Sequence, residues 1–204
     1  EAYRCWKEVW SEALLELDGS DKIHSDEFTR HDEVSAVFLK NKCIGTTSFC
    51  WMDFGLSPTK DDSYFKIWTP KAIEALTKYD SKVLVCSFFT LHPDGRQGKL
   101  GINMKDVLMG LLVKRFLDSG AKSMTGTVRN NRGVNLSTYR HGAEVLERDL
   151  KLHGVDVDLV AFYQDTAHVS QDPIIAHVVE SLWNKRLTYA DKATRLQARL
   201  PRAA

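Results

Sequence analysis

The chain has 204 residues, of which 43% are hydrophobic and 27% are charged. These proportions are typical of a globular protein, and the length is enough for one domain with a substantial core. The formal net charge is only +1, so no large electrostatic field indicates binding to nucleic acid or to an anionic membrane. We therefore predict a single domain over residues 1–204 and no nucleic-acid partner.

The cysteines and the apolar runs favour a cytoplasmic protein. Cys5, Cys43, Cys50 and Cys86 are scattered, with no Cys-x-x-Cys spacing, so we expect reduced thiols and no metal site. No apolar run in the sequence reaches the roughly 18 residues of a membrane span, and we expect neither a span nor a signal peptide. The chain begins at Glu1 rather than at a methionine, which weakens the expectation about targeting.

The first third of the chain predicts one helix and one hairpin. Apolar residues recur three and four apart over residues 3–17, which is typical of an amphipathic helix. Residues 20–31 are polar and turn-like, either a solvated loop or a cover over a substrate pocket. Two β-rich runs at 34–39 and 43–52 flank a short turn and predict an antiparallel hairpin. Residues 53–63 are expected to form a loop, as a candidate pocket rim.

The stretch over residues 82–101 joins a buried strand to a glycine-bearing turn. A helix over 69–79, capped by Thr69, precedes it. Residues 83–91 are rich in β-branched and aromatic side chains, which predicts a buried strand. The turn after it carries three glycines and two basic residues, and an apolar helix begins near Asn103. Backbone N–H groups and the helix dipole converge at such a helix N-terminus, which favours an anion such as phosphate.

The second half of the chain extends the predicted sheet. The apolar helix stops at Gly120, and a strand over 121–128 follows it. Because a helix joins the two strands, this strand lies parallel to the one at 83–91. The remaining elements are two strands that form a hairpin and a final amphipathic helix, at 144–152, 155–163 and 173–189.

The glycine-bearing turn resembles the acyl-donor motif of the GCN5-related N-acetyltransferase (GNAT) superfamily. That motif reads His-Pro-x-x-Arg-x-x-Gly-x-Gly/Ala, between the fourth strand of the superfamily and the helix after it. Here the motif begins at His92, with Arg96 and Gly101 in register. Lys99 stands where the first glycine of the motif is expected.

A second stretch resembles the second GNAT motif. That motif opens a short helix with an asparagine and ends in a glycine that turns into the next strand. Asn131 and Gly142 hold these positions. Thr138 occupies the place of the usual tyrosine, and Tyr139 follows one position later.

The resemblance implies a GNAT-like α/β (α+β) fold, with a mixed, mostly antiparallel sheet, a central splayed pair of parallel strands and helices on both faces. Its core would span about 33–163. In this fold a pantetheine thioester lies between the parted strands. An acyl-CoA or acyl-carrier-protein thioester would therefore be a co-substrate, with no permanently bound cofactor. The residues that the resemblance assigns to the donor are Phe89, Thr90, Leu91, Arg96, Gln97, Gly98, Lys99, Leu100, Gly101 and Asn131.

The chain departs from the superfamily at the general base. Many relatives carry a glutamate early in the fourth strand, and Val85 stands at that position here. Ser87 is a candidate to position a water, or else a hydroxyl bonded to the backbone. Tyr139 is the candidate acid that protonates the leaving thiolate, or else a buried helix tyrosine. Asp26 and Glu27 in the preceding loop are alternative bases.

Some features resemble a subset of the superfamily, the autoinducer synthases and long-chain N-acyl amino acid synthases. A lysine at position 99 suits acyl groups drawn from acyl carrier protein, where no nucleotide needs a tight cradle. Tyr3-Arg4, the loop over 25–32 and Ile44-Gly45 are also similar to that subset. The aromatic residues that would then line an acyl tunnel, or otherwise form a core, are Trp51, Phe54, Phe65, Trp68, Phe88 and Phe89.

The sequence therefore predicts an N-acyltransferase. It would move an acyl group from acyl-CoA or acyl carrier protein to the amine of a small molecule such as an amino acid. If the chain belongs to the subset described above, the acyl group would be a long chain. An acetyl-CoA-dependent N-acetyltransferase of a small-molecule or protein amine is the alternative enzyme. A GNAT-shaped module that binds acyl thioesters without turnover is the alternative of another class, and the missing strand glutamate favours it.

Overall fold

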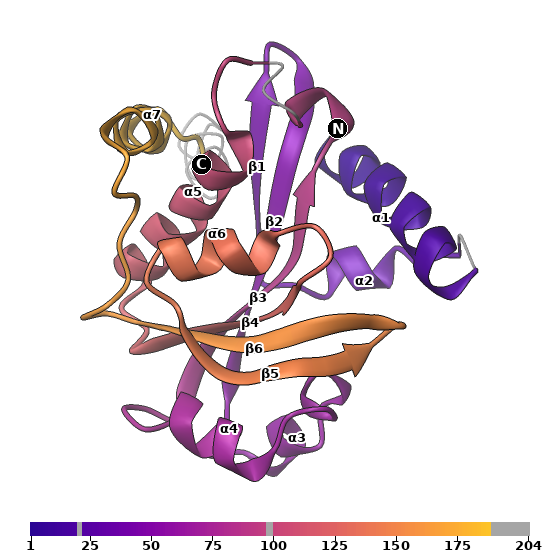
Figure 1. Cartoon of the computed structure of the whole chain (residues 1–204), viewed down its shortest axis with the longest axis vertical. Helices are drawn as coiled ribbons and strands as arrows, with labels where there is room; N and C mark the ends of the chain where they lie inside the picture. The colour runs from indigo at the N-terminus through magenta and orange to yellow at the C-terminus, as the bar shows by residue number, and fades with distance from the viewer. Residues whose placement is uncertain (20–21, 97–99, 189–204) are drawn as a thin grey trace, which may run out of the picture.

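A six-stranded sheet forms the centre of the computed structural model, which describes residues 1–19, 22–96 and 100–188. Its strands, β1 to β6, are Glu33–Leu39, Lys42–Asp53, Lys82–Leu91, Ser123–Arg129, Glu144–Leu152 and Val155–Tyr163. They lie in the order β1-β2-β3-β4-β6-β5, and each neighbouring pair is antiparallel except β3 with β4. The predicted mixed, mostly antiparallel sheet is therefore confirmed (Figure 1).

Helices cover both faces of this sheet, as predicted. In chain order, α1 to α7 are Ala2–Asp18, Asp26–Thr29, Ser57–Lys60, Pro70–Leu76, Met104–Ser119, Val134–Arg140 and Pro173–Asn184, and the 3-10 turns η1 and η2 are Ser63–Phe65 and Pro93–Gly95. Figure 1 shows α1 and α2 on one side of strands β1 to β3, and α5 with α7 on the other. None of these helices, within the ranges described, has both the length and the apolar character needed to cross a membrane.

The observed elements differ from the predicted ones mainly at their ends. Helix α4 stops at Leu76 rather than at residue 79. Just after its end, the Thr77 hydroxyl donates to the Ile73 carbonyl at 2.8 Å and competes with the helical hydrogen bonds. Helix α7 ends at Asn184, and residue 189 of the predicted helix lies outside the described residues. The stretches predicted as loops contain the short helices α2 and α3.

The ends of α5 show how local sequence sets this helix. The Asn103 side chain accepts a hydrogen bond from the Asp106 backbone N–H at 3.4 Å, and Gly120 ends the helix with a φ of +77°. Mid-helix Gly110 lies against Val179 of α7 and against Val169 in the segment before that helix. A Cβ at this position would lie 2.8 Å from the Val169 carbonyl oxygen. Glycine at this position therefore permits the close approach of this segment to α5.

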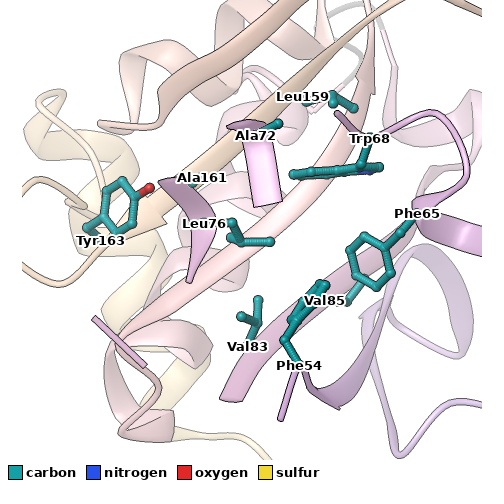
Figure 2. Packing of buried hydrophobic residues seen from close by; sticks show 10 residues of the cluster. All are labelled: Phe54, Phe65, Trp68, Ala72, Leu76, Val83, Val85, Leu159, Ala161 and Tyr163. Atoms are coloured by element: carbon teal, nitrogen blue, oxygen red, sulfur yellow. The ribbon is translucent and has the colours of Figure 1, made fainter. Parts of the chain in front are cut away.

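Two hydrophobic clusters pack on opposite faces of the sheet. Val83 and Val85 of β3 face α4 and belong to the cluster in Figure 2, which consists of Phe54, Phe65, Trp68, Ala72, Leu76, Val83, Val85, Leu159, Ala161 and Tyr163. The intervening Leu84 and, on β4, Met124 face α5 and join the cluster of Phe49, Leu84, Met109, Leu112, Val113, Phe116, Ala121, Met124 and Phe162. Alternation along each strand therefore decides which side chains face which helix.

The parallel strands β3 and β4 stay together over a short length. Their register in the described residues consists of Leu84 with Met124 and Val85 with Thr125. Strand β3 nevertheless continues to Leu91 beside β2, and β4 continues beside β6. The predicted splayed pair is therefore present, and it divides the sheet into a β1-β2-β3 half and a β4-β6-β5 half.

Candidate active site

A cavity of about 850 Å³ occupies the gap between the parted strands. Residues 86–89 and 91 of β3 line one side, and residues 124–129 of β4 line the other. Helices α1 and α5 contribute further walls, and most of the lining side chains are apolar. The volume falls within the range of sites that hold small molecules or cofactors.

A bulge in β3 shapes the wall of this cavity. Ser87 pairs with Ser48 and the next registered pair is Thr90 with Thr46, so β3 carries one extra residue at this place. Phe88 has a φ of 50°, in the left-handed region that non-glycine residues seldom occupy. A bulge of this kind takes one residue out of the hydrogen-bonded ladder and bends the strand.

Aromatic rings from outside the sheet hold Phe88 in this conformation. The rings of Trp6, Trp10 and His31 meet the Phe88 ring edge-on, with centroid distances of 5.4, 5.0 and 5.5 Å. Trp6 is fully buried, whereas Trp10 lines the cavity. Helix α1 therefore fixes the bulge and forms part of the cavity wall.

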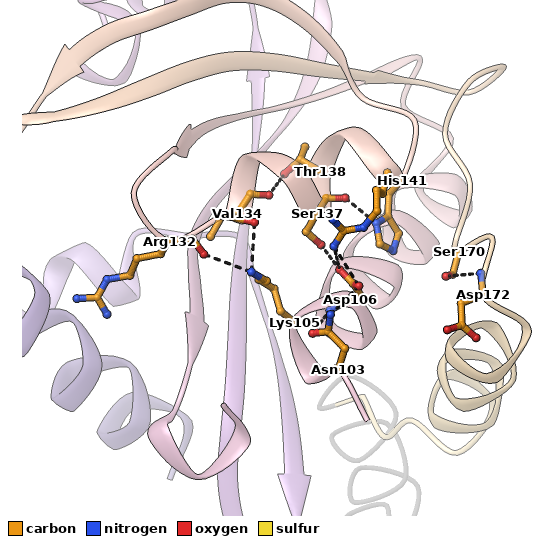
Figure 3. Close-up of polar contacts among 12 residues, drawn as sticks. Asn103, Lys105, Asp106, Arg132, Val134, Ser137, Thr138, His141, Ser170 and Asp172 are labelled. Carbon is orange, nitrogen blue, oxygen red and sulfur yellow. Dashed lines mark hydrogen bonds and ion pairs between the residues drawn. The ribbon is translucent and has the colours of Figure 1, made fainter. Parts of the chain in front are cut away.

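The N-terminus of α5 opens onto the cavity, which residues 101–105 line. Gly101 has a φ of +69° at the approach to the helix, a conformation that glycine adopts readily. Figure 3 shows the Lys105 ammonium donating to the carbonyls of Arg132 and Gly133, each at 3.2 Å. The free N–H groups of the first helical turn and the helix dipole make this end of the cavity favourable for an anion.

The first turn of α5 is also tied to α6. Asp106 accepts hydrogen bonds from the Ser137 hydroxyl at 2.5 Å and from the Arg140 guanidinium at 2.9 Å (Figure 3). His141, just after α6, is buried beside this contact, and burial lowers the pKa of its imidazole. His141 therefore belongs to the packing around α6.

No family model matches the chain, and no curated protein matches its sequence. Solved structures do match. The N-acyl amino acid synthase FeeM from uncultured soil microbes is 13% identical, with a TM-score of 0.53 over 79% of this chain and 84% of that one. The CoA-dependent acyl-homoserine lactone synthase BjaI, solved with SAM and isopentyl-CoA, is 13% identical, with a TM-score of 0.52 over 88% and 78%.

A third solved structure is yncA, a putative acetyltransferase from Salmonella typhimurium with its cofactor acetyl-CoA. It is 14% identical, with a TM-score of 0.50 over 85% of this chain and 95% of that one. At these identities the likenesses show the fold alone. The chain has the GNAT fold.

The residues that the GNAT resemblance assigns to the donor separate in the structure. Those that line the cavity are Phe89, Leu91, Arg96 and Gly101. Thr90 faces α1, where its hydroxyl oxygen accepts a hydrogen bond from Trp10 Nε1 at 2.9 Å. Leu100 packs among apolar residues of α5 and α7, and Asn131 is exposed. Gln97, Gly98 and Lys99 lie outside the described residues.

Ser87 lines the cavity, and its hydroxyl meets a residue from outside the sheet. The Ser87 Oγ atom lies 2.9 Å from Nε2 of His31, in the turn between α2 and β1. Burial lowers the pKa of His31, while the backbone at Phe28 opposes that shift and the charge of Arg30 adds to it. The imidazole is therefore neutral at pH 7 and can accept a proton. Sequence reasoning missed His31, because only the fold brings it to Ser87.

Tyr139 lies outside the cavity lining, and its hydroxyl donates to Asp158 on β6. The Arg148 guanidinium lies 5.3 Å from the centroid of the Tyr139 ring. Thr138, at the usual GNAT tyrosine position, does line the cavity, and its hydroxyl donates to the Val134 carbonyl at 2.8 Å. The structure therefore places the Tyr139 phenol beside a carboxylate and the shorter Thr138 side chain at the cavity.

A second phenol reaches the gap from the segment between β2 and β3. The Tyr64 hydroxyl oxygen accepts a hydrogen bond from the Thr127 backbone N–H at 3.1 Å. Thr127 lies on β4 beyond its last pairing with β3, so this hydroxyl takes the place of a strand partner. Burial raises the pKa of Tyr64, so the phenol keeps its proton at neutral pH. The sequence pattern gave no signal for this contact.

The aromatic residues considered for an acyl tunnel separate in the structure. Phe54, Phe65 and Trp68 belong to the core cluster of Figure 2. Trp51 is 42% exposed on β2. Phe88 and Phe89 line the cavity, together with Val9, Trp10 and Ala13 of α1. Helical periodicity marks Trp10 as a core residue, and the sequence could not show that the core on that side contains the cavity.

Asp158 gives this region a pH dependence. Burial would raise the pKa of Asp158, but hydrogen bonds from the Tyr139 hydroxyl and the Asp149 backbone N–H outweigh burial and lower it. A carboxyl group with a lowered pKa in the folded state stabilises the fold above its unfolded pKa of about 4, and this stabilisation is lost as the pH falls through the folded value.

We therefore expect Asp158→Asn to lower the free energy of unfolding at pH 7 by about 1–3 kcal/mol. The difference from the wild type should shrink progressively as the pH falls below about 4. Urea denaturation at several pH values measures both. Asp156→Asn on the same strand is the control, because its carboxylate is 46% exposed and pairs with Lys151 at the surface. Equal losses for the two variants would contradict the prediction.

Proposed function

We propose that this protein is an N-acyltransferase that moves an acyl group from a pantetheine thioester to the amine of a small molecule. The observation that carries the proposal is the mainly apolar cavity between the parted strands, which meets the N-terminus of α5. A cavity of this form suits an arm with a phosphate at one end and a thioester at the other. The similar solved proteins named as an N-acyl amino acid synthase and an acyl-homoserine lactone synthase support it.

The donor is proposed to lie along β3. Past Val85, the edge of β3 that faces β4 is outside the parallel register, so its backbone groups can pair with the amide groups of pantetheine. Phe89 and Leu91 line this part, and Arg96 is held beside it by a hydrogen bond from its Nε to the Leu91 carbonyl at 2.8 Å. Phosphate oxygens would meet the first turn of α5 beside Gly101. Acyl-CoA and acyl carrier protein both carry such an arm.

The acyl group is proposed to be a long chain. The cavity continues past the strands into apolar side chains from α1, α5 and β6, which include Val9, Ala13, Met109, Leu112 and Phe162. Burial of apolar surface stabilises by roughly 0.8 kcal/mol for each CH₂ group. A lining of this kind would therefore discriminate in favour of long acyl chains, whereas an acetyl group would leave it unused.

The reaction is aminolysis of the thioester. The amine nitrogen attacks the carbonyl carbon, a tetrahedral oxyanion forms, the C–N bond is completed and the C–S bond breaks to release the thiol. A backbone N–H released from the ladder by the bulge at Phe88 would stabilise the oxyanion. Ser87, with His31 behind it, would take up the proton that the amine loses. This pair replaces the strand glutamate, since Val85 is buried in the core.

The proton for the leaving thiolate is proposed to come from a phenol. Tyr139 is the candidate by motif, and in this role its hydroxyl would turn from Asp158 toward the cavity. Tyr64 is the candidate by position, because its hydroxyl already lies in the gap at Thr127. Each is protonated at neutral pH, since burial raises the pKa of both phenols.

The acyltransferase proposal is tested by incubating the protein with acetyl-, octanoyl- and hexadecanoyl-CoA, the matching acyl carrier proteins and a pool of amino acids. We expect mass spectrometry to show N-acyl amino acids and a parallel release of free thiol, with the long-chain donors preferred. Products from acetyl-CoA alone would favour an acetyltransferase. Saturable binding of the donors without any thiol release would indicate a module that binds acyl thioesters, and the absence of binding would reject the proposal.

The Ser87–His31 pair predicts a pH profile. Because the pKa of His31 is lowered, its base form is present at neutral pH, and kcat/KM should fall as the pH drops below about 6.5. We expect His31→Gln to lower kcat by roughly tenfold to a hundredfold and to remove this acidic limb, and Ser87→Ala to have a similar effect. His177→Gln, exposed on α7, is the control. A His31 variant that keeps the wild-type profile would exclude the pair from catalysis.

The two phenols are distinguished by single substitutions. The variant that lacks the proton donor should lose roughly tenfold to a hundredfold in kcat with little change in the KM of the donor. This loss should also shrink with donors whose thiol has a lower pKa, since a better leaving group needs less protonation. If neither Tyr64→Phe nor Tyr139→Phe changes kcat, the thiolate leaves without a phenolic acid.

A further inference from the structure

Arg129, the last residue of β4, carries a half-buried guanidinium that lines the cavity. Its Cζ atom lies 4.7 Å from the centroid of the Trp10 ring, so the guanidinium stacks on that indole. Within the ranges that the structure describes, the guanidinium forms no ion pair or side-chain hydrogen bond. It therefore presents free N–H donors to the cavity from a fixed position.

The acidic residues nearest to Arg129 are already engaged. Glu16 pairs with Arg132, and Asp18 pairs with His153 at 2.8 Å. Burial lowers the pKa of Arg129, the charge of Arg132 lowers it further, and Glu16 and Asp18 only partly offset these effects. Arginine remains charged under such conditions, and a partly buried charge without a partner is unfavourable. The site therefore favours a ligand that brings a negative charge.

The position of Arg129 separates it from the proposed phosphate site. Met124 of β4 faces α5, and side chains alternate along the strand, so Arg129 faces the opposite side, where it meets α1. Ser87 of β3 faces that same side, through its contact with His31. The anion that Arg129 would hold thus lies on the α1 side of the gap, away from the N-terminus of α5.

We propose that Arg129 binds the carboxylate of the amine substrate, so that the acceptor is an amino acid or another amine that bears a carboxylate. This inference rests on the proposed acyltransferase function. The planar guanidinium, held over the Trp10 ring, carries paired N–H donors that match the two oxygens of a carboxylate. A substrate held there reaches from β4 toward β3, with its amine directed to Ser87 and to a thioester between the strands.

The experiment compares each of the twenty amino acids with its primary amide, with hexadecanoyl-CoA as donor and thiol release as the measurement. We expect the wild type to prefer the carboxylate form by at least about tenfold in kcat/KM. Arg129→Gln should remove this preference by lowering kcat/KM for the amino acids alone, with the KM of the donor unchanged. Arg129→Lys should restore part of it. Circular dichroism and thermal melting verify that both variants fold.

Arg4→Gln is the matched control, because Arg4 is an exposed residue of α1 that pairs only with Glu1 among the described residues. It should keep the wild-type preference for carboxylate acceptors. Equal rates with amino acids and amides in the wild type would overturn the proposal. An Arg129→Gln variant whose main defect is a higher KM for the donor would also overturn it, since the guanidinium would then bind the donor.

A binding measurement separates this proposal from the proposed function. Saturation-transfer NMR with the same amino acids and amides, in the presence of CoA, requires no turnover. Carboxylate-dependent binding that is lost in Arg129→Gln supports the inference even if no thiol is released, and in that case only the acyltransferase function fails. Binding that is absent, or that is the same for acids and amides, overturns the inference while leaving acyl transfer to other amines open.

Discussion

The separation of β3 from β4 after two registered pairs is the constraint on which the rest of the structure depends. Backbone N–H and C=O groups that leave a sheet need other partners or water, because an unpaired buried group is unfavourable by about 1–3 kcal/mol. Side chains supply some of these hydrogen-bond partners. The Tyr64 hydroxyl accepts from the Thr127 N–H, and at the bulge the Thr90 hydroxyl, which accepts from Trp10, donates to the Phe88 carbonyl at 2.7 Å. The remaining edge faces a cavity of about 850 Å³.

The two faces of this opening differ chemically. On the α5 side, helix N–H groups and the approach through Gly101 favour phosphate. On the α1 side, an arginine that has no carboxylate partner among the described residues and a serine bonded to a neutral histidine favour a substrate that brings an anion and loses a proton. In the proposed reaction, the donor and the acceptor would enter from these opposite faces and meet at the level of the parted strands. This arrangement is one way to hold them in attacking geometry.

Much of the fold could be predicted from the sequence, since it follows from local patterns. The run at 83–91, the cap at Asn103 and the stop at Gly120 each lie in short segments whose conformation their own residues favour. The site was less predictable. The motif pointed to the turn that is proposed to bind the donor, but the contacts of His31 with Ser87 and of Tyr64 with Thr127 join residues far apart in the chain. Helical periodicity also cannot distinguish Trp6, which is fully buried in the core, from Trp10, which lines the cavity.

The position of helix α1 bears on which substitutions would alter the size of the cavity. It packs on β2 and β3 and contributes the side chains of Val9, Trp10 and Ala13 to the wall, while the strands carry the bulge and Ser87. Part of the cavity wall and the proposed proton-accepting pair of Ser87 and His31 thus come from separate segments of the chain. A larger side chain at Ala13 would narrow the cavity without a change at Ser87 or His31, so the size of the ligand and the proposed chemistry could vary independently.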